Sequence, residues 1–191
     1  PDYLQKMVDN EWLGQKSKQG FYKKIDKGVI HSIDLETLEY TAMNKKRYAA
    51  ITLAKEKTYS RDKLNAIVRS DDVAGNFLWN IISKSLLYAA NNVGSIADDI
   101  VSIDNALKWG FGWELGPFEV LDAIGLEYFV ERIKSEGNTI TPWINDMLSS
   151  GFTCMYILLD GKKEYYCINN KAYMPVHHHK KEIYFNIIKS K

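Results

Sequence analysis

The sequence predicts a mainly α-helical fold that ends in a β-hairpin. Apolar residues recur at helical spacings of three and four through most of positions 45 to 150, which favours amphipathic helices. Beyond position 152 the pattern changes to short alternating segments around Asp160-Gly161, a pair typical of two-residue hairpin turns. With 191 residues, the chain is long enough for one well-packed core or for a small domain with appendages.

The N-terminal piece begins with a short amphipathic helix and ends in turns. The helix carries its apolar residues at Tyr3, Leu4, Met7 and Val8, and turns are expected at Gly14 and Gly20. Residues 23–40 lack a clear period and are predicted to form a connector. Within it, Asp34–Leu38 is expected to make a single helical turn.

Seven helices are expected between the connector and the hairpin. Ser60 is the expected cap of the second helix, Asp71 or Asp72 of the third, and Thr141 of the last, which begins with Pro142. The third helix places Phe77, Leu78, Ile81, Ile82, Leu86 and Ala89 on a stripe that we expect to face the core. The expected ranges are 45–57, 61–68, 73–91, 98–109, 117–124, 126–135 and a final helix from Pro142.

The hairpin around Asp160-Gly161 has a definite predicted register. Pairing Leu159 with Lys162 places Cys154 opposite Cys167 at a non-hydrogen-bonded pair, where side chains approach most closely. The two cysteines could form a cross-strand disulfide or remain two thiols, and a cytosolic setting favours the thiols. Residues 172–176 are expected to add a third strand, and residues 183–191 look like a linker.

Composition excludes several classes of function. Basic residues (25) and acidic residues (24) nearly balance and form no long basic block, which argues against a dedicated nucleic-acid surface. No apolar run approaches the roughly 18–20 residues that span a bilayer, and no signal-peptide pattern begins the chain, so we expect a cytoplasmic protein without a membrane partner. The start at Pro1 suggests a fragment.

A glycine-rich corner is the most informative motif. It runs from Lys108 to Glu119, where Gly110 and Gly112 allow a helix to end and Gly116-Pro117 begins the next one. The corner carries Trp109, Phe111, Trp113 and Phe118, and packing is the simplest explanation for these aromatic residues.

The corner and its surroundings also resemble a known family. The pattern Ile103-Asp104-x-Ala106-x-Lys108-x-Gly110-x-Gly112-x-x-x-Gly116-Pro117-Phe118-Glu119-x-x-Asp122-x-x-Gly125 resembles the signature of the C-terminal helical domain of 3-hydroxyacyl-CoA dehydrogenases. Leu13-Gly14-Gln15-Lys16-x-x-x-Gly20-Phe21-Tyr22 resembles the segment that closes the same domain. The resemblance therefore implies a 6-phosphogluconate-dehydrogenase-C-terminal-like helical fold.

The order of the two motifs implies a duplicated domain. The closing segment precedes the signature, so residues 1–40 would be the end of a first helical copy with a connector, and residues 41–151 a second copy. Residues 152–191 would then form the β-hairpin and a linker tail. This order occurs in the multifunctional dehydrogenase and enoyl-CoA hydratase type, and the tail resembles the junction before the hydratase.

The resemblance implies an NAD-dependent enzyme of fatty-acid β-oxidation, although this chain lacks the expected catalytic parts. No G-x-G-x-x-G turn lies between a strand and a helix, so NAD would be held by an upstream domain of the full-length parent. The catalytic His–Glu pair of the family belongs to that domain. Neither catalytic nor cofactor-binding residues are therefore assigned here, and we expect the chain alone to be inactive.

The candidates for the acyl-CoA cleft or for an interface are Trp79, Asn80, Trp109, Trp113 and Phe118. The family places an Asn near the start of the long helix, close to the reacting oxygen of the substrate. Anchoring the alignment on Gly75 puts Trp79 at that position, whereas anchoring on Phe77-Leu78 puts Asn80 there. The partners implied are the upstream NAD-binding and first helical domains, acyl-CoA through the parent, and a homodimer.

An alternative reading is a non-catalytic helical dimerisation or scaffold module without a ligand. The remaining chemical candidates are weaker. His31 is expected at the surface, and the His177–His179 run is expected to be a solvated tail because contiguous residues rarely provide three ligands to one metal. No metal site is therefore predicted. Asp98 and Asp99 are explained by helix capping and solvent.

Overall fold

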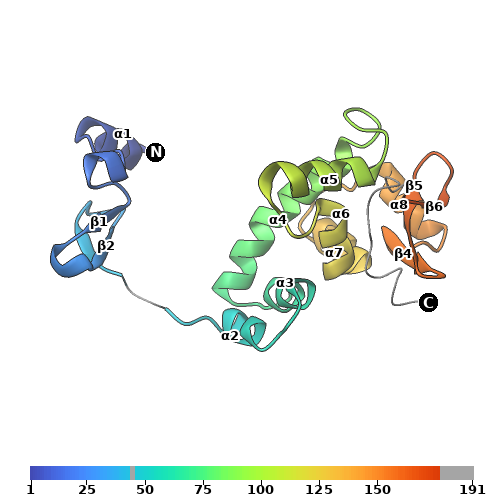
Figure 1. Cartoon of the computed structure of the whole chain (residues 1–191), viewed down its shortest axis with the longest axis horizontal. Coiled ribbons are helices and arrows are strands. Elements are labelled where there is room, and N and C mark those ends of the chain that lie inside the picture. Colours follow the sequence, from blue (N-terminus) through green and yellow to red (C-terminus); the bar gives the residue numbers. More distant parts are fainter. Residues whose placement is uncertain (44–45, 177–191) are drawn as a thin grey trace. The chain divides into compact units, whose positions relative to one another are not determined.

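The computed structural model describes residues 1–43 and 46–176 and contains two compact units, Pro1–Arg47 and a second beginning at Tyr48 (Figure 1). The His177–His179 run and the expected linker 183–191 lie outside the described residues. The second unit holds most of the helices and the C-terminal strands. The prediction of a mainly α-helical fold with C-terminal strands is confirmed.

The first unit is a helix followed by a small sheet, so residues 23–40, predicted as a connector, contain regular strands instead. Helix α1 (Asp2–Asp9) leads through the 3-10 turn η1 (Gln15–Ser17) into strands β1 (Tyr22–Lys24), β2 (Ile30–Ile33) and β3 (Tyr40–Ala42), with the short turn η2 (Asp26–Gly28) between β1 and β2. The strands form an antiparallel sheet in the order β1-β2-β3.

Contacts that are distant in sequence stabilise this sheet. Tyr40 donates its hydroxyl to the Gly20 carbonyl (2.6 Å), and its ring lies edge-on to Trp12. The segment Asp34–Leu38 forms a tight turn in which the Asp34 carboxylate accepts the amides of two following residues. The strands are short and lack strict alternation, so their hydrophobic period did not reveal them.

The second unit contains seven helices within the described residues. They are α2 (Ala49–Lys55), α3 (Ser60–Val68), α4 (Val73–Asn91), α5 (Ile100–Phe111), α6 (Pro117–Ile124), α7 (Leu126–Ser135) and α8 (Pro142–Ser149). All seven were predicted, although α2 is shorter at both ends than expected and α5 begins and ends two residues later than expected.

The helix caps differ in part from the prediction. Asp72 caps α4 by accepting the Gly75 amide (2.9 Å), and Asp99 caps α5 by accepting the Ser102 amide (2.7 Å). Neither Ser60 nor Thr141 makes a side-chain cap, and the Ser60 hydroxyl donates instead to Glu114 (2.6 Å). Because Ser60 already lies within α3, its side chain is free for this tertiary contact.

The C-terminal strands form a second antiparallel sheet in the order β4 (Tyr156–Leu159), β5 (Lys162–Cys167) and β6 (Ala172–Pro175). Leu159 pairs with Lys162, so the predicted register is confirmed, and the predicted third strand is present. The ladder stops at Tyr156, however, before it reaches Cys154. Cys167 pairs with Ala172 of β6, and both cysteines are free thiols.

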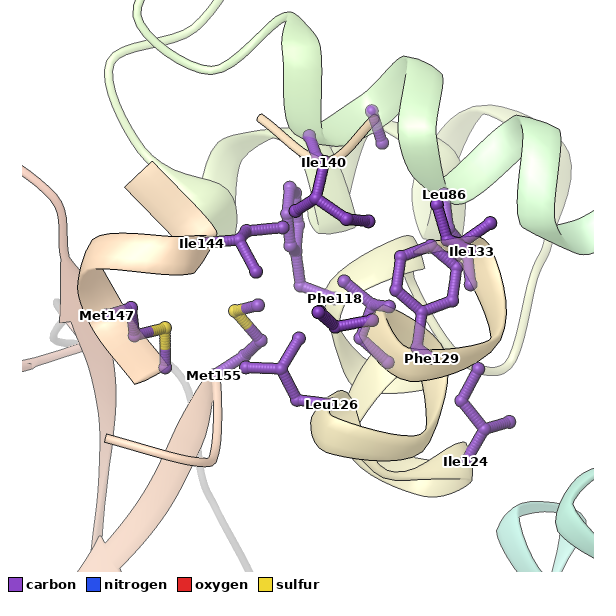
Figure 2. Packing of buried hydrophobic residues seen from close by; sticks show 14 of the residues in the cluster. Leu86, Phe118, Ile124, Leu126, Phe129, Ile133, Ile140, Ile144, Met147 and Met155 are labelled. Atoms are coloured by element: carbon purple, nitrogen blue, oxygen red, sulfur yellow. The ribbon is translucent and has the colours of Figure 1, made fainter. Parts of the chain in front are cut away.

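The core lies where the helices meet the first residues of the second sheet. Figure 2 shows Phe118 and Phe129 surrounded by aliphatic side chains of α4, α6, α7 and α8, with Met155 entering from the strand side. Phe118, Phe129 and Met155 are each 0% exposed. Burial of large apolar side chains contributes about 1.5–3 kcal/mol each, so this cluster is the main source of stability.

Helix α4 contributes to the core through a face that only partly coincides with the predicted stripe, because Leu86 and Ala89 are buried and Leu78 and Ile82 pack against the core. Trp79, Ser83, Leu86 and Ala90 are buried, whereas Phe77 and Ile81 are 67% and 49% exposed. The helix therefore has two apolar faces, and the sequence period alone does not say which of them is buried.

Candidate functional site

The signature carboxylates converge where the α5–α6 corner meets the second sheet. Asp104 of α5 is fully buried and accepts hydrogen bonds from the amides of Phe118 (2.8 Å) and Glu119 (3.2 Å), in the first turn of α6. It also accepts the hydroxyl of Tyr156 (2.8 Å), on β4. Asp104 therefore joins three elements by itself.

Glu119 forms a second set of contacts in this corner. Its carboxylate accepts the Gly116 amide (3.0 Å) and pairs with Lys108 (3.1 Å) and with Lys163 (2.5 Å). Burial disfavours the charged carboxylate, but the Lys163 and Gly116 hydrogen bonds and the two lysine charges outweigh it and hold the pKa of Glu119 below its ordinary value. The pairs connect α5 and β5 to the start of α6.

Asp122 attaches the beginning of β4 to α6. Its two oxygens accept the amides of Met155 (2.6 Å) and Tyr156 (2.8 Å). Burial raises the pKa of both Asp104 and Asp122 to about 6, against the effect of the amide donors. All three carboxylates are thus occupied by bonds within the protein.

Two glycines of the signature are explained by local geometry. Gly112 ends α5 in the left-handed conformation (φ 67°), which favours glycine. Gly116 lies directly against Asp104, and a Cβ atom at this position would overlap the aspartate side chain. Gly110, in contrast, lies inside α5 with open space around it.

The structure divides the candidate site residues into two groups. Trp79 and Phe118 are 1% and 0% exposed and belong to the core, whereas Trp109 and Trp113 are 77% and 47% exposed. Asn80 is also exposed, and its amide nitrogen donates to the Asn76 carbonyl (2.9 Å). The structure therefore does not bring the five candidates into one cleft.

Trp79 is held by polar groups as well as by packing. Its indole nitrogen donates to Glu136 (2.6 Å), and the Arg132 guanidinium lies over its ring, 4.3 Å from the centroid. Arg132 also donates to Asn76 (3.1 Å) and to the Val68 carbonyl (3.2 Å). These contacts connect the start of α4 to α3 and α7.

The second unit has an apolar groove of about 630 Å³ between the C-terminal half of α4 and helix α5. Of the candidate residues, Trp113 lines the groove. Its other lining residues come from α4, the following loop and α5: Lys84, Ser85, Tyr88, Ala89, Asn92, Ile96, Ala97, Ser102, Ile103, Ala106 and Leu107. A volume of this size and an apolar lining are typical of sites for organic ligands.

The groove continues into the exposed apolar face of α4. Phe77, Ile81 and Tyr88 are spaced by four and seven residues, so they share one side of the helix. All three are about half exposed or more. The groove was not predicted from the sequence. The apolar residues on this exposed side of α4 have the same spacing as core residues, so the sequence does not distinguish the two sides.

The remaining chemical candidates are isolated. The His31 ring nitrogen lies 3.4 Å from the Tyr40 carbonyl, within the first unit. Within residues 1–43 and 46–176, no cluster of three His, Cys, Asp or Glu side chains could hold a metal ion. Among these residues, too, no helix has the length and hydropathy needed to cross a membrane.

Comparison with known proteins confirms the resemblance found in the sequence. The chain is 43% identical over 189 residues to a Bacillus subtilis (strain 168) protein named "Probable 3-hydroxyacyl-CoA dehydrogenase". This match covers 99% of the chain and 24% of that protein. It is 31% identical over 121 residues to a Rickettsia felis protein named "Putative fatty acid oxidation complex trifunctional enzyme" (62% of the chain, 15% of that protein).

The chain thus spans about a quarter of the length of one curated relative and less of the other. No protein-family model matches it. No solved structure matches it either.

Proposed function

We propose that this chain is a segment of a 3-hydroxyacyl-CoA dehydrogenase of fatty-acid β-oxidation, because its similarity to a relative of that name extends over 99% of its length. In the parent, a 3-hydroxyacyl-CoA would be oxidised to the 3-oxo form, with NAD as hydride acceptor. The described segment would be non-catalytic. Its role would be to shape the acyl-CoA cleft and to form the interface between domains or subunits.

One observation carries this proposal: the carboxylates of the corner are directed into the protein, whereas Trp109 and Phe111 are exposed. The carboxylate oxygens of Asp104, Glu119 and Asp122 accept hydrogen bonds from backbone amides and from Tyr156, and Glu119 also pairs with two lysines. These oxygens are therefore not available as a general acid or base, because such a group must lie within hydrogen-bonding distance of the substrate proton. What α4 and α5 offer a partner is the groove and the exposed apolar face beside it.

The packing of α4 supports a degenerate second copy. A Cβ atom at Gly75 would overlap the Ser70 carbonyl, so glycine is required where α4 starts against the end of α3. This requirement favours the alignment anchored on Gly75, which puts Trp79 where the family carries its substrate-contacting Asn. Trp79 is buried and bonded to Glu136, and a substrate could not reach it.

The two units support the duplication. Helix α1 and strands β1–β3 repeat the order of helix α8 and strands β4–β6, each sheet being antiparallel with sequential strand order. In the second unit Ile144 and Met147 of α8 are both 0% exposed, while in the first unit Leu4, at the same spacing from Met7, is 40% exposed. The first unit would be the end of a first copy whose helical body lies elsewhere in the parent.

The ligand role is tested by titrating the chain with acetoacetyl-CoA, with and without NADH, while following heat and tryptophan fluorescence. Trp113 lines the groove and Trp109 does not. Binding there would change fluorescence in the Trp109→Phe variant but not in Trp113→Phe. NADH formation from a 3-hydroxyacyl-CoA by the purified chain would contradict the non-catalytic role.

A blocking variant makes this test sharper. Ser85 is exposed and lines the groove, so Ser85→Phe fills it without disturbing the core. Glu131→Phe, on the exposed side of α7, is the matched control. Loss of acyl-CoA binding in Ser85→Phe alone supports the cleft, whereas equal binding in both variants places the ligand elsewhere.

The second candidate is a dimerisation or scaffold module without a ligand, and the aromatic surface favours it. Trp109 and Phe111 are 77% and 74% exposed on the last turn of α5, next to Gly112. Large exposed aromatic groups of this kind mark protein interfaces. Self-association that disappears in a Trp109→Ser, Phe111→Ser variant, together with no heat from acyl-CoA, would support the scaffold reading.

A further inference from the structure

The two cysteines lie at the open end of the β4–β5 ladder. The paired strands end at Tyr156 and Tyr165, and one further hydrogen bond, from the Tyr166 amide to the Met155 carbonyl (2.8 Å), continues the same register. Continued by one more position, this register would place Cys154 opposite Cys167. Because Met155 and Tyr166 are hydrogen-bonded, this next position is of the non-hydrogen-bonded type, where Cα atoms approach to about 4.5 Å.

The surroundings keep Cys154 beside the sheet but do not close the pair. The chain bends at Met155, whose amide donates to Asp122 (2.6 Å) and not to β5. Tyr173 of β6 donates its hydroxyl to the Cys154 carbonyl (2.8 Å), which holds this segment near the sheet. On the other side, Cys167 pairs with Ala172 of β6.

The two thiols also differ in access to solvent. Cys154 is exposed and Cys167 is partly buried, and both are free. Cysteines that react with peroxide are solvent-accessible and often have a second, resolving cysteine next to them, and Cys154 and Cys167 could take these two roles. A disulfide requires a Cα separation of about 4.4–6.8 Å, which a non-hydrogen-bonded pair at this register position would provide once the bend at Met155 straightens.

We propose that Cys154 and Cys167 form an intramolecular disulfide in response to hydrogen peroxide. The Cys154 thiol releases its proton and the thiolate attacks one peroxide oxygen, which breaks the O–O bond; the departing hydroxide takes up a proton to become water and leaves a sulfenic acid. The Cys167 thiol likewise loses its proton, and its thiolate attacks the Cys154 sulfur; the displaced hydroxide takes up that proton and leaves as a second water. The sulfurs lose two electrons in total, and the peroxide takes them up. This pair is independent of the proposed dehydrogenase function.

The test uses the full 191-residue chain, treated with substoichiometric to equimolar hydrogen peroxide. We expect wild type to lose both free thiols together, and non-reducing peptide mapping to find the peptides of Cys154 and Cys167 linked. Cys167→Ser should accumulate a sulfenic acid that dimedone labels at Cys154. Cys154→Ser should keep its thiol under the same conditions, and a thiol reductant should restore both thiols in wild type.

Three results would overturn the proposal. One is a wild-type chain labelled by dimedone at Cys154 as strongly as Cys167→Ser, since Cys167 then resolves nothing. Another is a disulfide found only between two chains. The third is the survival of both thiols in wild type while an added model thiol is consumed. The fold of each variant is checked by its circular dichroism spectrum, which a Cys-to-Ser change at these exposed or partly buried positions should leave unchanged.

Discussion

Gly116 shows how one residue of the signature depends on close packing. Its Cα lies against the side chain of Asp104, so Gly116→Ala must displace either the aspartate or the start of α6. We expect this substitution to lower the free energy of unfolding by roughly 1–3 kcal/mol. Urea denaturation followed by circular dichroism measures it.

Gly110→Ala is the matched control for Gly116→Ala. It lies within α5 with nothing within 4 Å of a new Cβ atom, so it should stabilise the protein by about 0.5–1 kcal/mol through helix propensity. If both glycines tolerated alanine equally, the close approach at Gly116 would not matter to stability.

The hydrogen bond between Asp104 and Tyr156 can be isolated by a double-mutant cycle. Tyr156→Phe removes the hydroxyl that Asp104 accepts at 2.8 Å, and Asp104→Asn removes the charge. A hydrogen bond to a charged group contributes about 1.5–3 kcal/mol, so we expect the two changes to be coupled by an energy of that order.

Tyr165→Phe is the control for this cycle, because Tyr165 is the cross-strand partner of Tyr156, whereas the hydrogen bond to Asp104 comes from Tyr156. Its coupling with Asp104→Asn should be close to zero. Similar coupling for both tyrosines would mean that the cycle reports a general loosening of the corner.

At the scale of elements, Asp72 connects two helices. One carboxylate oxygen caps α4 through the Gly75 amide, and the other accepts the Ala50 amide at the start of α2 (2.9 Å). Asp99 makes only one such bond, to Ser102. We expect Asp72→Ala to lower the melting temperature more than Asp99→Ala, because it leaves two helix starts without their acceptor.

Acid should remove the Asp72 contribution in a defined direction. The Ala50 and Gly75 amides lower the pKa of Asp72, so its stabilisation is present above the ordinary value of 3.8 and is lost as the pH falls through the lower, folded-state pKa. The difference in melting temperature between wild type and Asp72→Ala should therefore shrink below pH 4. A difference that stayed constant into strong acid would show that the charge is not involved.

Helix α4 illustrates why an element can be predicted while its orientation is predicted only in part. Its range was predicted correctly, and Asp72 was one of the two caps considered. The predicted core stripe, however, included Phe77 and Ile81, which are exposed. Trp79, Ser83 and Ala90 face the core because α3, α6 and α7 cover that side, and this covering depends on contacts with residues far away in the sequence.

At the scale of the whole molecule, two buried carboxyl groups predict an unusual dependence on pH. Burial raises the pKa of Asp104 and Asp122 from 3.8 to about 6, so between these values the folded chain binds more protons than the unfolded chain. The free energy of unfolding should then fall as the pH rises from about 4 to about 6. Glu119, with its lowered pKa, acts in the opposite direction and limits the effect.

The measurement is urea denaturation at pH 5 and at pH 7. A tenfold change in proton affinity corresponds to about 1.4 kcal/mol, and we expect the chain to be more stable at pH 5 by an amount of that order. The Asp104→Asn, Asp122→Asn variant should lose this difference. Greater stability of wild type at pH 7 would show that the amide donors outweigh burial.

The division into two units predicts that they differ in independent stability. The second unit contains the whole hydrophobic cluster, from Val68 to Tyr166, so a fragment of residues 48–176 should fold alone with a cooperative thermal transition. The first unit buries few apolar residues, chiefly Met7 and Ile33, and exposes Leu13 and Tyr22. A fragment of residues 1–47 should lack a cooperative transition, because so small a core cannot offset chain entropy.

The sequence by itself determined the helices, the hairpin register and the resemblance to 3-hydroxyacyl-CoA dehydrogenases. These depend on information that is local in the chain: periods of three and four, capping and turn residues such as Asp72 and Asp160-Gly161, and fixed spacings such as Gly116-Pro117. The bounds of α7 were predicted to the residue, and Leu159 pairs with Lys162 as expected.

Only the tertiary structure decided which apolar side chains are buried and what the carboxylates bind. Trp79 and Trp109 are both tryptophans within predicted helices, yet Trp79 is 1% exposed and Trp109 is 77% exposed. Asp104 reaches Tyr156, 52 residues away, and the β1–β3 sheet forms from segments with no clear period. Burial and long-range hydrogen bonds are properties of how elements pack together, and a local pattern allows several packings of similar hydrophobic area.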